Sequence, residues 1–361
     1  MVCVKRQSLF FLNVAGGNRI KYLYHFLNFS TMKQVNFLVI AIAFFSTGLL
    51  LQHAAAASHL SLIESGTAKV TDEDGNKPPA IEWIDIAMKQ VRLMRAAKDF
   101  PQEKRDRLLL DSIFMPYTGL WHGYLGQEAA FLNWVNNTAF SELGEYEKKL
   151  KGICTLEMEK IFKRNVQDMK SLTGFTPQGK WYVFFGPKWT NLGGLGDGTM
   201  LIDLANSANT SLEDITRVFA HEINHQIYTL TCPPNDNAVL YRILNEGFAC
   251  YVSYLYHQES TSIARELAYS EAQYQACREN DARAIELLRE HYQSNDHQLS
   301  RLFAHRQYLF YDDLPGALGY YIGFRIVEEY VKRFGTDSWI DIYTLQPEEV
   351  LMKSEILNLY Q

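Results

Sequence analysis

The chain has 361 residues, 47% of them hydrophobic and 21% charged, which is enough for one enzyme-sized domain or two small ones. Its formal net charge is −6, but residues 1–57 carry five Lys or Arg and no Asp or Glu, so the remainder holds 30 basic and 41 acidic residues. A surface of that sign repels phosphate backbones, and no basic run with interleaved aromatic residues follows residue 57. We therefore expect no nucleic-acid partner.

The first 57 residues have the layout of a secretory signal. An almost wholly apolar stretch, residues 35–51, follows Met32-Lys33 and precedes four alanines at 54–57. Translation from Met32 would give a complete signal, so residues 1–31 are interpreted as a misassigned start. We expect an exported protein, periplasmic or secreted, that contacts the membrane only if this segment stays uncleaved as an anchor.

A linker and a helical region are predicted next. Residues 58–79 are polar and rich in Gly, Lys, Asp and Pro, as in a linker. Over residues 80–175 apolar residues recur every three or four positions with few Gly or Pro. This pattern predicts a helical N-terminal region, interrupted near residues 116–126.

Residues 176–361 form the expected catalytic region, which opens with two strands. Residues 180–186 and 199–205 are apolar and flanked by glycine, as strands are. The glycine-rich run 193–198 between them lacks the Lys and Ser/Thr of a phosphate cradle and is interpreted as a hairpin loop. We expect residues 199–205 to lie at the sheet edge, where a substrate can add as a strand, and we assign Asp203 no catalytic role.

A ligand-bearing helix is predicted after the second strand. Residues 210–213 (Thr-Ser-Leu-Glu) have a capping-box pattern, which predicts a helix from there through His225. Residues four apart share a helix face, so His221 and His225 can bind one metal ion, with Glu222 beside them facing a water molecule. The alternative is a surface helix that happens to carry two histidines.

A zinc site needs a third protein ligand and an open fourth position. Glu246 lies 21 positions after His225, on a second predicted helix at residues 238–256. A carboxylate in so apolar a helix is costly to bury unpaired, and metal coordination removes that cost. The alternatives are a Glu on an exposed turn, with Gly247 as an ordinary helix interruption, and Asp236, in a loop after two prolines.

These motifs resemble those of known zinc peptidases. The His-Glu-x-x-His run at 221–225, followed by Asn245-Glu246, resembles the gluzincin metallopeptidases, typified by thermolysin. Residues 219–225, 245–249 and 319–324 (Gly-Tyr-Tyr-Ile-Gly-Phe) together are similar to bacterial predicted zinc-dependent proteases related to gliding-motility lipoproteins, over residues 180–357. The resemblance implies an α+β, mainly helical, zincin-like fold with a small β-sheet before the ligand helix.

The chain departs from these families in two ways. Cys250 stands where thermolysin-like enzymes have an Asp that orients a ligand His, so an orienting carboxylate is expected from elsewhere. No Cys directly follows the N-terminal apolar run, so the lipid anchor usual near the gliding-motility group is not expected.

The expected function is hydrolysis of peptide bonds in a peptide or protein substrate, with zinc (Zn2+) as cofactor. Zinc lowers the pKa of a bound water and polarises the scissile carbonyl, while Glu222 passes the water proton to the leaving amine. Tyr320, near a helix start in the family-like motif, is the first choice of oxyanion donor and Tyr321 the second. Two alternatives stay open: a non-catalytic exported binding protein on a zincin scaffold, and a deformylase-like amidase, which needs an upstream Cys ligand.

Four cysteines remain once Cys3 is removed with the signal, in a compartment that permits disulfides. We expect Cys232 to be joined to Cys250, because one lies just past the first ligand helix and the other one turn beyond Glu246. The alternative is that the cysteines are small buried hydrophobic residues.

Overall fold

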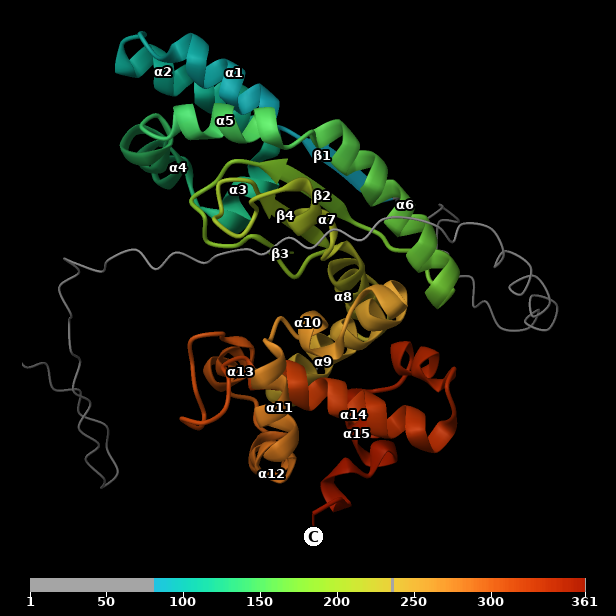
Figure 1. The fold of residues 1–361 in the computed structure, drawn as a ribbon. Helices are drawn as coiled ribbons and strands as arrows, with labels where there is room; N and C mark the ends of the chain where they lie inside the picture. The colour runs from blue at the N-terminus through green and yellow to red at the C-terminus, as the bar shows by residue number, and fades with distance from the viewer. Residues whose placement is uncertain (1–80, 235–236, 361) are drawn as a thin grey trace, which may run out of the picture. The chain divides into compact units, whose positions relative to one another are not determined.

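The structure is a computed structural model that describes residues 81–234 and 237–360 (Figure 1). The predicted signal at 1–57, with Met32, and the predicted linker at 58–79 lie outside the described residues. So does Asp236, the alternative third ligand. Among the helices that are described, none combines the length and apolar character needed to cross a bilayer.

A mixed sheet of four strands has the order β1-β2-β4-β3. Its strands are β1 (Glu82–Asp85), β2 (Lys180–Phe184), β3 (Leu192–Gly194) and β4 (Thr199–Asp203). β2 pairs in parallel with β1 and with β4, while β3 runs antiparallel to β4. The expected strands are confirmed as β2 and β4, and the α+β class agrees with this sheet among many helices. β1 was expected to be helical, because its four residues merge with the apolar period of the helix that follows.

The prediction that residues 199–205 form the sheet edge is wrong. β4 is an inner strand, and the edge is β3, in which Gly193 pairs with Leu201 and Gly194 with Met200. The first two residues of the glycine-rich run therefore belong to β3 and the other four form the hairpin turn, a division that the low strand propensity of glycine concealed. At the end of β4 the buried Asp203 carboxylate accepts hydrogen bonds from three backbone N–H groups and a tyrosine hydroxyl, which is a structural role.

Nine helical segments lie between β1 and β2. They are α1 (Ala87–Ala97), α2 (Gln102–Leu109), η1 (Leu110–Phe114), η2 (Met115–Tyr117), α3 (Thr118–Tyr124), α4 (Glu128–Trp134), η3 (Val135–Ala139), α5 (Leu143–Gly152) and α6 (Thr155–Thr173). The expected interruption at 116–126 is narrower than predicted, because helical turns continue to Tyr124. Phe162 of α6 packs on Trp83 of β1 and Trp181 of β2, so the N-terminal helices share a core with the sheet.

The predicted cap is found one residue later and opens a separate short helix. The Ser211 hydroxyl accepts a hydrogen bond from the Asp214 backbone N–H and caps α7 (Leu212–Thr216). α8 (Phe219–Thr231) then starts afresh, so the prediction of one helix from the cap through His225 is wrong. The break consists of Arg217 and Val218, and the Arg217 guanidinium pairs with Glu266 at 3.0 Å.

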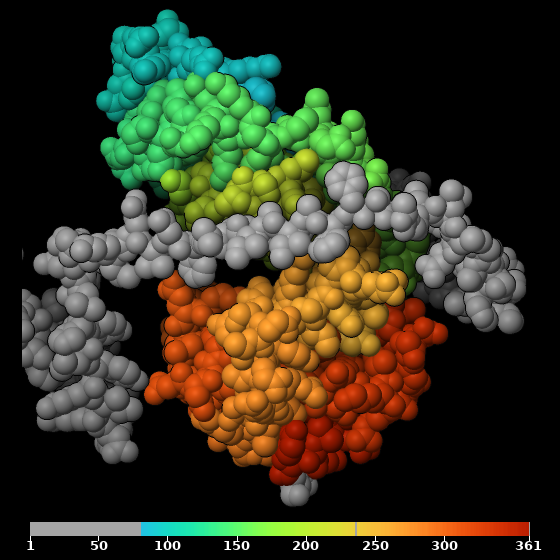
Figure 2. Space-filling view, viewed as in Figure 1, coloured from blue at the N-terminus to red at the C-terminus, as the bar shows by residue number. Residues whose placement is uncertain are grey.

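The remaining helices gather around α9 (Ala238–His257), which is confirmed within one residue of its predicted end. They are η4 (Gln258–Ser260), α10 (Ile263–Glu266), α11 (Glu271–Glu279), α12 (Asp281–His291), α13 (His297–Ala304), α14 (Leu318–Phe334), η5 (Ser338–Tyr343), α15 (Pro347–Ser354) and η6 (Ile356–Asn358). Most of α9 is buried, as expected for a helix that is apolar on all sides. In Figure 2 the orange and red helices lie together on one side of the yellow-green sheet residues.

Candidate metal centre

α8 is held against the sheet by a polar bridge next to the ligands. The Trp181 Nε1–H donates to Gln226 Oε1 at 2.7 Å, and Gln226 Nε2 donates to the Gly198 carbonyl at 2.9 Å. Phe219, at the helix start, meets the Trp181 ring edge-on. These contacts bury one face of α8 and turn His221 and His225 toward α9.

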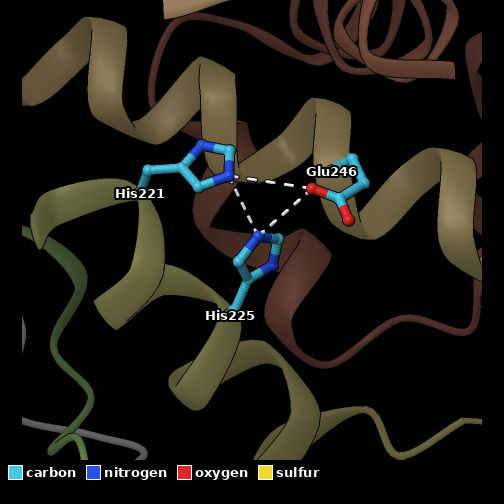
Figure 3. Close-up of side chains that lie close together, drawn as sticks. All are labelled: His221, His225 and Glu246. Carbon is cyan, nitrogen blue, oxygen red and sulfur yellow. Dashed lines mark hydrogen bonds and ion pairs between the residues drawn. The ribbon is translucent and has the colours of Figure 1, made fainter. Parts of the chain in front are cut away.

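Three potential ligand atoms converge between α8 and α9 (Figure 3). The Nε2 atoms of His221 and His225 lie 3.0 Å apart, and Glu246 Oε2 lies 3.7 Å from the first and 3.3 Å from the second. All three atoms lie within 4.8 Å of one another, close enough to hold one ion. In the described part of the chain no other group of three or more His, Cys, Asp or Glu side chains meets this condition. The cluster of His221, His225 and Glu246 contains no Cys, so the ligand set of a deformylase-like amidase is not found there.

Both imidazoles are oriented by neutral groups on α9. The Nδ1–H of His225 donates to Asn245 Oδ1 at 2.9 Å, which leaves the Nε2 lone pair for a metal. Cys250 Sγ lies 3.8 Å from His221 Nδ1, and its thiol donates to the Glu266 carbonyl at 3.3 Å. The expectation of an orienting carboxylate is therefore wrong, since an amide and a thiol occupy these places.

Glu246 is buried and ion-paired, unlike a Glu on an exposed turn. Its side chain is 8% exposed, and Arg242, one turn earlier, contacts Oε1 at 3.2 Å while Oε2 faces the histidines. Burial opposes the charge, but the two imidazoles hold the pKa of Glu246 well below its usual range. Against the same burial, the Glu246 carboxylate raises the pKa of His225 to about 9.

Gly247 marks a helix crossing and not an interruption of α9. A Cβ on Gly247 would lie 2.1 Å from the carbonyl carbon of Gly323, and one on Gly323 would lie 1.9 Å from the Ile243 oxygen. The backbones of α9 and α14 therefore touch at this point. Tyr320 lies one turn before Gly323, so the contact brings Tyr320 next to Glu246.

The two tyrosines of the family-like motif point in different directions. The ring of Tyr320 is nearly parallel to the imidazole of His221, with centroids 6.2 Å apart, and the Arg306 guanidinium carbon lies 4.4 Å from the centroid of the Tyr320 ring. Tyr321 is fully buried and its hydroxyl donates to Asp281 at 2.5 Å, away from the ligands. Tyr321 is therefore ruled out as an oxyanion donor at this site.

A cleft of about 690 Å³ opens onto the ligand atoms. Its walls are formed by Leu192, Gly193, Gly194, Gly196, Asp197, Gly198, Thr199, Met200, His221, Glu222, His225, Gln226, Thr229, Leu230, Pro233, Pro234, Tyr241, Arg242, Asn245, Glu246 and Tyr320. Glu222 and Tyr320 thus share the cleft with the three ligands. Burial raises the pKa of Glu222, although His225 and His221 act against it.

The predicted bridge between Cys232 and Cys250 is wrong, because both are free thiols. Cys232 donates to the Leu345 carbonyl at 3.4 Å, whereas Cys250 faces His221 and Glu266. The two side chains have separate neighbours at opposite ends of α8. Cys232, Cys250 and Cys277 are buried, which fits the alternative that they pack as small hydrophobic residues, and Cys154 is exposed.

Sequence reasoning missed Arg242, Arg306 and the roles of Asn245 and Cys250. The i, i+4 spacing of Arg242 and Glu246 on a predicted helix is a signal that could have found the first. Arg306 lies in the loop before α14, which shows no clear helical or strand pattern, and only the packing of that loop brings it to Tyr320.

Residues 188–352 match a family model described as "Predicted Zn-dependent protease (DUF2268)". The matched segment includes the three potential ligands, Glu222 and Tyr320, and covers less than half of the chain. The family description suggests a zinc-dependent protease for this region and names that activity as a prediction. No curated protein and no solved structure matches the chain significantly.

Proposed function

We propose that this protein is an exported zinc metallopeptidase of the gluzincin type that hydrolyses peptide bonds. One observation carries the proposal: two Nε2 atoms from α8 and a carboxylate oxygen from α9 lie within 4.8 Å of one another in a cleft that also contains Glu222. The family description of residues 188–352 supports the same activity. Export rests on the signal-like residues 35–57 alone.

The donor set fits zinc. Two imidazole nitrogens and one carboxylate oxygen are a common ligand set of catalytic zinc, which keeps its fourth position for water or substrate. The Nε2 atoms of both histidines are left for the metal. The Nδ1 atom of His225 is hydrogen-bonded to Asn245, and the Nδ1 atom of His221 contacts Cys250. Zinc bound here would act as a Lewis acid that activates water and polarises the scissile carbonyl.

Glu222 and Tyr320 supply the proton transfers and hydrogen bonds in this proposal. Glu222 accepts a proton from the attacking water and passes it to the leaving amine. The Tyr320 hydroxyl donates to the oxygen on which negative charge develops. Burial, and after it the Glu246 charge, raises the pKa of Tyr320 well above its usual range, so the hydroxyl keeps the proton that it donates in this hydrogen bond.

The edge strand β3 gives an extended substrate a place to bind. β3 pairs with β4 on one side only, and Gly193 and Gly194 line the cleft beside the ligands. A peptide that adds as a further strand would satisfy the outer backbone groups of β3. Two of the three β3 residues are glycine, so we expect β3 to contact the backbone of a substrate more than its side chains.

The proposal is tested by comparing the wild type with Glu222→Gln and Tyr320→Phe on an unstructured protein substrate. We expect about one bound zinc per chain in all three, chelator-sensitive cleavage by the wild type, and a loss of at least about a hundredfold in kcat for Glu222→Gln, the usual scale of general-base catalysis. Tyr320→Phe should lose activity with KM little changed. Cleavage that persists in Glu222→Gln would contradict the mechanism, and a chain that binds no zinc would contradict the function.

A further inference from the structure

We propose that Arg242 binds a carboxylate of the substrate close to the scissile bond, so that the enzyme prefers peptides bearing a negative charge there. The charge is either the C-terminal carboxylate or an Asp or Glu side chain. The inference rests on the proposed peptidase function and names the substrate class of that same cleft.

Arg242 differs in charge from the other residues that line the cleft. It lies on α9 one turn before Glu246, and among the described residues that line the cleft it is the one Lys or Arg. The acidic groups there are already engaged or belong to the centre itself. Asp197 accepts a hydrogen bond from the Thr199 backbone N–H in the β3–β4 turn, Glu246 contacts the histidines, and Glu222 is the proposed general base.

Most of the Arg242 guanidinium is unused by the protein. Nη1 contacts Glu246 Oε1 at 3.2 Å, and in the described chain this is its one hydrogen bond and ion pair. The side chain is 44% exposed. Guanidinium presents five N–H donors in a planar fork that matches a carboxylate with two parallel hydrogen bonds, so donors remain for a ligand.

The charge balance around Glu246 favours an anion once a metal is present. In the structure Arg242 and the two imidazoles share a single carboxylate, whose atoms lie 3.2–3.7 Å from them. A divalent cation on Oε2 takes up that negative charge, and the guanidinium is then no longer neutralised by Glu246. The exposed Leu230 and the neighbouring Pro233 and Tyr241 line the same cleft, and their apolar surface strengthens a charged contact.

The distances place the carboxylate near the reacting bond. Glu246 bridges the two groups, with Oε1 on Arg242 and Oε2 on the histidines. An extended peptide advances about 3.3 Å per residue, so a carboxylate that reaches Arg242 belongs to a residue within about two positions of the scissile bond. A C-terminal carboxylate there would make the enzyme an exopeptidase, whereas a side chain would make it an acid-selective endopeptidase.

The test uses two matched pairs of peptides with the zinc-loaded full chain. One pair differs only in a free C-terminal carboxylate against an amide, and the other in Glu against Gln next to the cleaved bond. We measure kcat/KM for both members of each pair in the wild type, Arg242→Gln, Arg242→Lys and Arg265→Gln. Arg265 is exposed on α10 and does not line the cleft, so Arg265→Gln controls for the lost charge.

We expect the wild type to prefer the charged member of one pair by at least about tenfold, the effect of one hydrogen bond to a charged group. The ratio should fall to about one in Arg242→Gln, recover partly in Arg242→Lys and stay unchanged in Arg265→Gln. Because each ratio is taken within one variant, any general damage to the zinc site cancels. The pair that responds tells a C-terminal carboxylate from an acidic side chain.

A wild-type ratio of about one in both pairs, or an unchanged ratio in Arg242→Gln, overturns the inference. The same pairs are also titrated calorimetrically onto zinc-loaded Glu222→Gln with and without Arg242→Gln. This binding ratio decides the role of Arg242 even if no peptide is cleaved, and absence of cleavage then counts against the proposed function alone.

Discussion

The candidate metal centre takes two potential ligands from α8 and one from α9, and these two contributions are held in place by different forces. His221 and His225 share a helix face through their spacing of four, so local helix geometry suffices to pair them. Glu246 faces them only because α9 crosses α8 and α14, with Gly247 and Gly323 in backbone contact. The first half of the site therefore follows from local geometry and the second from tertiary packing.

Removing a histidine should have the largest effect on zinc binding, because no other side chain on that face of α8 can take its place as a ligand. We expect His221→Ala and His225→Ala to retain no zinc after dialysis, while Glu222→Gln, a non-ligand on the same helix, retains it. Elemental analysis of the purified proteins measures this. Zinc contents equal to that of the wild type in the histidine variants would show that the metal is bound elsewhere.

The helix crossing should be the next most sensitive feature. Gly247→Ala or Gly323→Ala places a methyl group about 2 Å from backbone atoms that cannot rotate away, so we expect a loss of about 3 kcal/mol in the free energy of unfolding. Gly144→Ala in α5 is the control, because no atom lies within 4 Å of its added Cβ. Denaturant titration compares the three, and equal stability would mean that the helices do not touch here.

The next prediction concerns Glu246, the potential ligand that the crossing of α9 and α14 brings to the histidines. We expect Glu246→Ala to weaken zinc affinity by at least about tenfold, or about 1.4 kcal/mol, while Asp236→Ala leaves it unchanged. Competition against a chelator gives both affinities. The reverse ranking would move the third ligand from α9 into the loop before it.

The comparison also explains which features the sequence could predict. The placement of His221 and His225 side by side on α8, strands β2 and β4 and the length of α9 each depend on residues adjacent in sequence, and these predictions agree with the structure. β1 and the inner position of β4 depend on pairing between distant segments, which local pattern does not encode. The expected disulfide failed for the same reason, since Cys232 at the end of α8 and Cys250 within α9 face different neighbours.

Substitution of Cys250 should change zinc affinity least. Cys250 lies on α9 and contacts His221 of α8, but it is not one of the three potential ligands. A carboxylate on the outer nitrogen of a ligand His raises its basicity, and changes to such partners commonly alter metal affinity about 10- to 100-fold. Here the thiol is neutral and 3.8 Å from His221 Nδ1. We therefore expect Cys250→Asp to tighten zinc binding several-fold, toward the lower end of that range.

Cys250→Asn separates charge from shape in this last experiment, because it has nearly the same size as Asp and no charge. A fully buried carboxylate costs stability unless it is paired, so Cys250→Asp should be less stable than the wild type without zinc and regain part of the difference when zinc is added. Thermal unfolding with and without zinc, beside chelator competition, measures both effects. If Cys250→Asn tightens zinc binding as much as Cys250→Asp, the charge of the group beside His221 does not set the zinc affinity. The effect of position 250 then comes from packing.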